Sequence, residues 1–178
     1  MRGISVPDLL TFLGLAAIIG AIAMYGVARY VRHAKTTEAV GSVTTLAAAA
    51  ARHYDESDSS QPTGANPSQV HAMRTFPPSS RVPVPEDQLN VRGKRYQSNQ
   101  AEWAVSPWKE MHFSIVQPQC YQYAFESDGA GAVAKATVTA QGDLDGDGVR
   151  STYSLGIAPD DTLSAKVGTT MLKQDAEE

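Results

Sequence analysis

The hydrophobic pattern is dominated by residues 9–28, a stretch near the beginning of the chain that contains no charged side chain. Its most polar members are Thr11 and the amphipathic Tyr25. A helix of about 20 residues spans the hydrocarbon core of a bilayer, so the pattern predicts one membrane-spanning helix. The stretch is too long, and its leading basic region too short, for a typical secretory signal. We therefore expect it to stay in the mature protein.

The residues that follow favour continuation of the same helix. Residues 29–54 are rich in Ala, the strongest helix former, and apolar residues recur at intervals that place them on one helix face. We predict one helix over residues 4–54, apolar on all sides in its first half and amphipathic in its second. The residues of the apolar stripe are Val40, Val43, Ala47, Ala50 and Tyr54.

The start of this helix carries capping signals. Ser5 is a favourable N-cap, and Pro7 falls in the first turn, where its missing N–H is not needed. Asp8 stands three residues after Ser5, the position of the acid in a capping box. An acid there also complements the positive end of the helix dipole. Capping alone thus accounts for a carboxylate at the edge of the apolar stretch.

An irregular connection and a strand-rich domain are predicted after the helix. Residues 55–85 are dense in Ser, Pro, Asp and Asn and predict a long loop. Residues 86–178 predict an antiparallel sheet of about four strands, covered by the amphipathic half of the helix in an α+β fold. The tail from Asp160 is expected to be frayed. The predicted strands are residues 112–116, 120–125, 132–140 and 150–157.

Composition excludes few classes of function. With 178 residues and a formal net charge of −4, the chain lacks the basic surplus of a nucleic-acid-binding protein. Cys120 is the single cysteine, so no disulfide forms within the chain.

The sharpest local motif is GDLDGDG, which places Asp143, Asp145 and Asp147 at alternate positions with Gly148 directly after them. This order matches the first half of a calcium loop, in which clustered oxygens offset the charge of the ion. The second half departs, because Ser154 stands where such a loop has its bidentate Glu. Asp-Gly pairs also supply the positive φ angles of hairpin turns. We interpret the motif as an acidic hairpin turn, with calcium binding at the three aspartates as the alternative and no other cofactor.

No residue pattern predicts catalysis. The four histidines lie far apart without metal-ligand spacing, and neither an activated nucleophile nor a Gly-rich phosphate loop occurs. The basic cluster at residues 92–95 is short and typical of a solvated turn. Four aromatic residues could stack on a sugar, but aromatics in strands are more typical of a core. They are Trp103, Trp108, Tyr121 and Tyr123.

Arg2 and Gly3 precede Ile4, and Asp8 is the fifth residue counted from Ile4. Together with the long helix and the predicted sheet, this beginning resembles that of type IV pilins and pseudopilins. In that family a prepilin peptidase removes a short basic leader ending in Gly, and the fifth residue of the mature chain is an acid, usually Glu. The resemblance implies a leader at residues 1–3 and cleavage between Gly3 and Ile4, with methylation of the new N-terminus.

The second half of the chain extends the resemblance. The segments GKRYQSNQAEW, PWKEMHFSIVQPQCYQYAF and ATVTAQGDLDGDGVRSTYSL follow one another. This order is similar to that in pilin-like proteins of myxobacteria, which carry a Gly-Lys-Tyr-like turn, two Trp and a GDLDGDG hairpin.

The resemblance implies self-association into a helical filament serving adhesion, motility or secretion. It implies that Asp8 neutralises the N-terminal amine of a neighbouring subunit, because an unpaired charge in an apolar bundle is costly. The precursor would sit in the inner membrane with its N-terminus cytoplasmic. It would then pass through inner-membrane assembly machinery to a pilus, the cell surface or the periplasm.

Two alternatives stay open. Within the same architecture, the chain is a pseudopilin of type II secretion or a minor pilin that primes assembly. From another class, it is an uncleaved single-pass membrane protein with a ligand- or calcium-binding β domain. The second is favoured by charge, because Arg29, Arg32 and Lys35 outnumber Arg2 across the apolar stretch, and basic residues prefer the cytoplasmic side.

Overall fold

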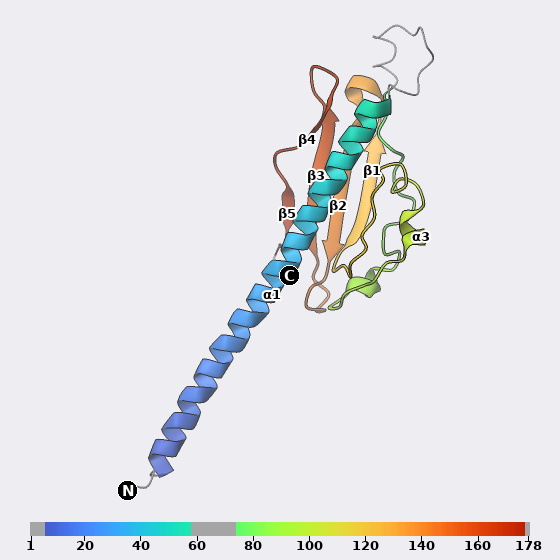
Figure 1. The fold of residues 1–178 in the computed structure, drawn as a ribbon. Helices are drawn as coiled ribbons and strands as arrows, with labels where there is room; N and C mark the ends of the chain where they lie inside the picture. Colours follow the sequence, from blue (N-terminus) through green and yellow to red (C-terminus); the bar gives the residue numbers. More distant parts are fainter. Residues whose placement is uncertain (1–5, 58–73, 177–178) are drawn as a thin grey trace, which may run out of the picture. The chain divides into compact units, whose positions relative to one another are not determined.

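The computed structural model describes residues 6–57 and 74–176. The chain divides into two compact units, Met1–Ala34 and Lys35–Glu178. Helix α1 (Val6–Glu56) supplies the described part of the first unit and continues into the second. We call the second unit the head, and Figure 1 shows the rest of α1 lying along its sheet.

Helix α1 has nearly the predicted extent of residues 4–54. Pro7 lies in its first turn, whereas Ser5, the predicted N-cap, lies outside the described residues. At the other end Ser57 Oγ donates to Tyr54 O at 2.7 Å. His53 lies in the last turn, where a basic group complements the helix dipole.

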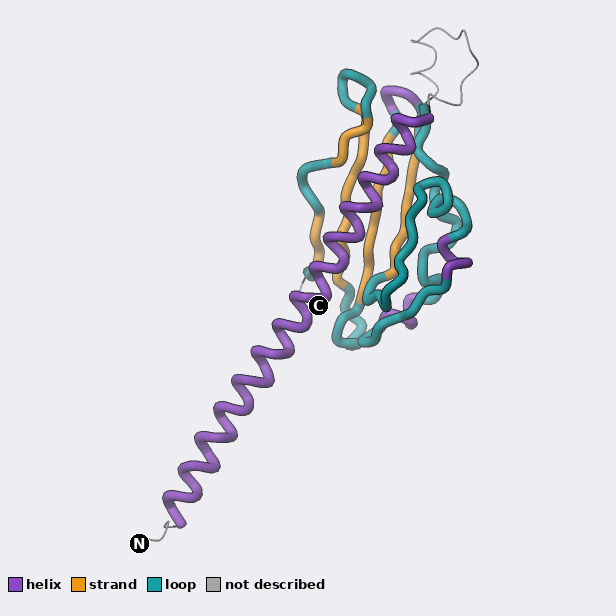
Figure 2. The backbone as a smooth tube through the Cα atoms, viewed as in Figure 1, coloured by secondary structure: helices purple, strands orange, loops and turns teal. Residues whose placement is uncertain are grey.

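The described part of the head contains one five-stranded antiparallel sheet (Figure 2). β1, β2 and β3 are neighbours in chain order. β4 and β5 share the remaining edge of β3, with β4 beside its end and β5 beside its beginning. The predicted α+β class is therefore confirmed. The strands are β1 (Gln122–Asp128), β2 (Lys135–Gly142), β3 (Ser151–Pro159), β4 (Ala165–Val167) and β5 (Leu172–Gln174).

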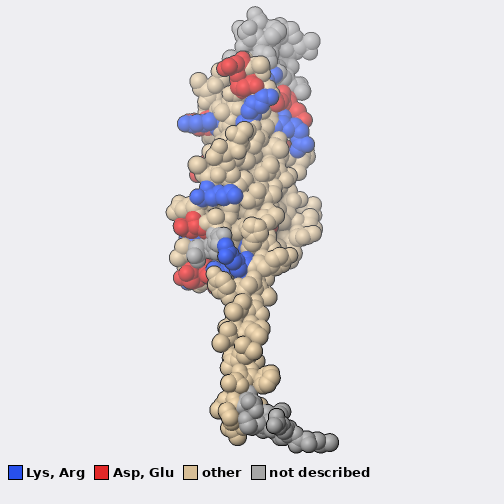
Figure 3. Space-filling view, turned by 90° about the vertical axis from the view of Figure 1, so that its left-hand side faces the viewer, with Lys and Arg blue, Asp and Glu red and all other residues tan. Residues whose placement is uncertain are grey.

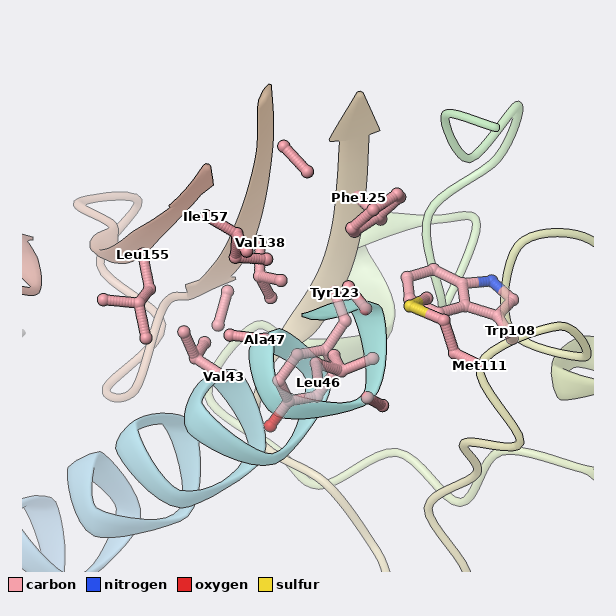
Figure 4. Close-up of a cluster of buried hydrophobic side chains, with 14 of the residues drawn as sticks. Val43, Leu46, Ala47, Trp108, Met111, Tyr123, Phe125, Val138, Leu155 and Ile157 are labelled. Atoms are coloured by element: carbon pink, nitrogen blue, oxygen red, sulfur yellow. The ribbon is translucent and has the colours of Figure 1, made fainter. Parts of the chain in front are cut away.

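The core forms between α1 and one face of the sheet. Burial alternates along β2 and along β3 as far as Ile157, as expected for strands with one covered face. Of the predicted stripe on α1, Val40 is partly buried and the other four members are fully buried. Figure 4 shows Val43, Leu46 and Ala47 of α1 facing Tyr123, Phe125, Val138, Leu155 and Ile157 of the sheet.

Hydrogen bonds join the last turns of α1 to the rest of the head. Tyr54 Oη donates to Gly131 O at 2.8 Å. Asp55 Oδ1 accepts from the Ala165 amide at 2.9 Å. These bonds add directional contacts to a helix that also packs against the sheet through apolar side chains.

The outer edge of β1 is covered by chain from the predicted loop 55–85. Val84 pairs with Tyr123 through two backbone hydrogen bonds of 2.8 and 2.9 Å. The Ser80 amide donates to Phe125 O at 2.8 Å. This pairing satisfies backbone N–H and C=O groups of β1 that, on an exposed edge strand, could form hydrogen bonds with another chain.

Three short helical segments complete the described head: η2 (Gln88–Val91), α3 (Gln100–Trp103) and η3 (Gly131–Val133). α3 begins with a capping box, in which the Asn99 side chain accepts from backbone amides and Glu102 accepts from the Asn99 amide at 2.7 Å.

The predicted strand at residues 112–116 is wrong. A helical turn ends there instead, with the Phe113 amide donating to Trp108 O at 3.0 Å and the His112 amide to Lys109 O at 3.2 Å. This is the hydrogen-bond pattern of a Schellman motif, and His112 has a φ of 51°. Periodicity cannot tell whether a short apolar run is a strand or the end of a helix. Here the end of the helical turn determines the conformation.

The prediction of a frayed tail from Asp160 is also wrong for the described residues. β4 and β5 extend the sheet as far as Gln174. Tyr153 Oη donates to Ala176 O at 2.7 Å, so a buried hydroxyl on β3 holds the tail beyond the last strand. Both strands are too short to show a clear alternation in the sequence.

Candidate functional site

The first functional candidate is residues 9–28 of α1, which we call the apolar segment. Its large described side chains are exposed by 54% to 76%. Figure 3 shows neither blue nor red along this segment on the face in view. An apolar surface of this extent is unfavourable in water and marks an interface with membrane or protein. By length and composition α1 can cross a membrane, with the candidate span beginning at Leu9.

The predicted processing and assembly residues lie around the beginning of α1. Gly3 and Ile4 lie outside the described residues. The backbone of Asp8 is part of α1, but the structure does not describe its side chain. Cleavage after Gly3 and charge pairing by Asp8 therefore stay predictions.

The second candidate is the acidic loop, residues 143–150, which connects β2 to β3 as expected of a hairpin turn. The buried carboxylate of Asp143 organises it. Asp143 Oδ1 accepts from the Gly146 amide at 2.6 Å, and Oδ2 accepts from the Gly148 amide at 3.0 Å. Gly146 and Gly148 have φ angles of +88° and +102°, which glycine adopts without strain.

Two residues of the basic cluster at residues 92–95, Arg92 and Gly93, contact this loop, whereas Lys94 and Arg95 are exposed as in a solvated turn. Arg92 Nε lies 3.4 Å from Asp143 Oδ2 and donates to Gly146 O at 3.1 Å. The Gly93 amide donates to Asp143 O at 2.7 Å. A Cβ at Gly93 would lie 3.2 Å from Gly146 Cα, a tight contact, and Gly93 has a φ of +62°, so both the close approach and the backbone conformation favour glycine.

The loop provides three carboxylates for a cation, with ligand oxygens within 4.8 Å of one another. Asp145 and Asp147 are exposed and accept from the Asp147 and Val149 amides at 3.2 and 2.7 Å. Ser154 lies in β3 with Oγ 3.3 Å from Thr139 Oγ1, so the position of the bidentate Glu belongs to the sheet. Hydrogen bonds and Arg92 already organise the loop, and calcium binding at its aspartates stays the alternative.

Two charged residues of α1, for which sequence reasoning predicted no contact within the head, bind backbone groups close to this loop. Lys35 Nζ donates to Leu144 O at 2.9 Å. Glu38 Oε1 accepts from the Cys120 amide at 2.8 Å. The sequence signal that could have indicated these contacts is the spacing of three residues between Lys35 and Glu38, which places both on one side of the helix.

Burial is the main cause of the raised pKa values of Glu38 and Cys120. It raises the pKa of the Glu38 carboxyl, although the Cys120 amide and the positive charges of Arg95 and Lys35 act in the opposite direction. Burial also raises the pKa of the Cys120 thiol, and the charge of Glu38 raises it further. Because the thiolate is the reactive form, Cys120 is an inert member of the core.

The aromatic residues considered for sugar stacking are core residues. Trp103, Trp108, Tyr121 and Tyr123 are all buried. The rings of Trp103 and Trp108 meet edge to face at a centroid distance of 5.3 Å. Trp103 Nε1 donates to Ser98 Oγ at 2.9 Å. None of the four rings offers a face to a ligand.

Comparison with known proteins gives no relatives: no family model, no curated protein and no solved structure matches this chain.

Proposed function

We propose that this chain is a type IV pilin-like structural subunit, anchored in the membrane as a precursor and assembled into a filament through its N-terminal helix. The observation that carries the proposal is the division of α1. Its first part is apolar and exposed, and its second part packs on the antiparallel sheet of the head. One helix thus serves both as an assembly element and as part of the core of a folded domain.

Such a subunit needs a helix surface that is stable both in the hydrocarbon core of a bilayer and between the helices of neighbouring copies. The apolar segment is long enough for the hydrocarbon core of a bilayer, and the same side chains can pack between helices when copies associate. The head needs no partner to bury its own core, because α1 covers the sheet within the chain. The sequence at Gly3, Ile4 and Asp8 supports processing and assembly of this kind.

Two variants of the role are consistent with this architecture. As a major pilin the chain would form the filament itself. As a type II secretion pseudopilin or a minor pilin it would form a short filament or prime one. Adhesion, motility and protein secretion are the corresponding activities.

A single-pass membrane protein that is never cleaved is the second candidate. The cations Arg29, Arg32 and Lys35 after the apolar segment favour it, because they would place the head on the cytoplasmic side. A pilin requires the opposite orientation.

N-terminal mass spectrometry of protein from membranes and from sheared surface material separates the candidates. We expect a mature chain beginning at Ile4, methylated at its amine, in both fractions. The control variant Gly3→Val should keep Met1 and stay in the membrane. An intact Met1 in wild-type protein, found in membranes alone, would contradict the pilin proposal and support the single-pass alternative.

A further inference from the structure

The end of the apolar segment combines cations and tyrosines with a complete lack of acids. Residues 9–37 contain no Asp or Glu. Arg29 and Arg32 follow the segment within two turns of α1. Tyr25 and Tyr30 are exposed by 70% and 76%. This part of the helix therefore carries two arginines and no acid of its own directly beside an apolar surface.

The spacing places part of this set on one side of the helix. Tyr25, Arg29 and Arg32 are separated by four and then three residues, which brings them onto a common face. At a rise of about 1.5 Å per residue they extend over about 10 Å of helix. Tyr25 lies in the last turn of the apolar segment, at the edge of the hydrocarbon core where tyrosines concentrate, and the two arginines follow it.

We propose that Arg29 and Arg32 bind the phosphate groups of anionic phospholipids where α1 leaves the membrane. The inference rests on the membrane anchoring in the proposed function. If residues 9–28 occupy the hydrocarbon core, both guanidinium groups lie at the depth of the lipid phosphates. Arginine recognises phosphate oxygens through paired N–H donors, and juxtamembrane cations are attracted to anionic lipid surfaces.

Both arginines also have polar interactions within the chain. A guanidinium carries five N–H donors in a planar fork, so it can contact a protein group and a lipid oxygen at the same time. A second copy of the chain fits this surface poorly, because its equivalent residues carry the same positive charge. Charge complementarity therefore favours the lipid over a neighbouring subunit at this point.

Lipid selectivity of the full chain tests the proposal. The protein is reconstituted into vesicles of phosphatidylcholine with a minor fraction of phosphatidylglycerol. Electron spin resonance of spin-labelled lipids then measures the relative association of each lipid with the protein. We expect phosphatidylglycerol to be preferred in wild type, and the preference to fall by up to about fivefold for each arginine replaced in Arg29→Gln and Arg32→Gln. High salt should weaken the preference in the same direction.

Arg52→Gln is the matched control, since Arg52 is an exposed arginine of the same helix about 30 Å farther along its axis. It should keep the preference, and so should the double variant Arg29→Lys with Arg32→Lys, which retains the charges. Equal association of both lipids with wild type, or a preference that survives loss of both arginines, would overturn the lipid site. If wild type fails to insert into these vesicles and is extracted by carbonate, the membrane anchoring itself is wrong.

Discussion

His112 occupies a backbone conformation that usually belongs to glycine. Its φ of 51° lies in the left-handed region, and the Schellman hydrogen bonds around it fix that conformation. Its side chain is exposed, so no core contact compensates for the cost. The sequence HFSIV gave no indication of this, because its apolar pattern is compatible with a strand.

We expect His112→Gly to raise the free energy of unfolding of the head by about 0.5–1 kcal/mol, because glycine adopts positive φ without a Cβ clash. His112→Val should lower it by about 1 kcal/mol or more, since a β-branched residue is least tolerated there. Urea unfolding of the full chain in detergent, followed by fluorescence of Trp103 and Trp108, measures both. A stabilising valine would contradict the assignment of strain to this position.

Glu38 should make the stability of the head depend on pH. Because burial raises its pKa in the folded protein, the unfolded chain releases this proton first as the pH rises. The contribution of Glu38 is therefore fully present below the ordinary carboxyl pKa and is lost as the pH rises through the raised value. Glu38→Gln removes the titration and keeps an oxygen that can accept from the Cys120 amide.

We expect the free energy of unfolding of Glu38→Gln to increase relative to wild type between about pH 4 and neutrality, the range above the ordinary carboxyl pKa. Subtracting the two pH profiles cancels the titration of other carboxylates. A constant difference across this range would show that the Glu38 carboxyl has an ordinary pKa.

At the scale of elements, the acidic loop shows how a sequence motif acquires its partner. The aspartates and glycines specify a turn between β2 and β3, but the contact with Arg92 and Gly93 depends on chain about 50 residues away. Asp143 alone is buried, whereas Asp145 and Asp147 are exposed. The three aspartates are thus equivalent in the motif and different in the fold.

We expect Asp143→Ala to lower the free energy of unfolding by about 1–3 kcal/mol in calcium-free buffer, because the Gly146 and Gly148 amides and Arg92 lose their acceptor. Asp145→Ala should change it by less than about 0.5 kcal/mol, as for most exposed positions. Repeating the measurement with millimolar calcium tests the alternative. A large calcium-dependent stabilisation that each substitution abolishes would establish the loop as a metal site.

At the scale of the whole molecule, α1 belongs to two units with opposite requirements. In the head its small residues pack against the sheet, and its free energy contribution comes from burial within the chain. In the first unit the apolar side chains are exposed, which marks an interface with a membrane or with protein. The proposed function as a subunit depends on this second requirement.

Asp8→Ala should leave the head folded and reduce filament incorporation. If Asp8 pairs with the amine of a neighbouring Ile4, its loss leaves that amine unpaired in an apolar bundle, at a cost of about 3–5 kcal/mol. We expect filament yield in sheared material to fall more than tenfold while the amount in membranes is unchanged, with Asp8→Glu as the control that retains the charge. Unchanged yield would refute charge pairing.

The sequence by itself determined the features that depend on local periodicity. The apolar segment, the stripe of α1 and the three long strands were all readable, because burial repeats with the period of each element. The sequence did not determine the turn at His112, the short strands β4 and β5, or the partners of Glu38 and Asp143. The turn rests on hydrogen bonds within residues 108–113. The strand pairings and the partners of Glu38 and Asp143 depend instead on contacts between distant parts of the chain, such as Glu38 with Cys120. Only the tertiary structure decides them, because the free energy of such a contact exists only once the fold has brought both residues together.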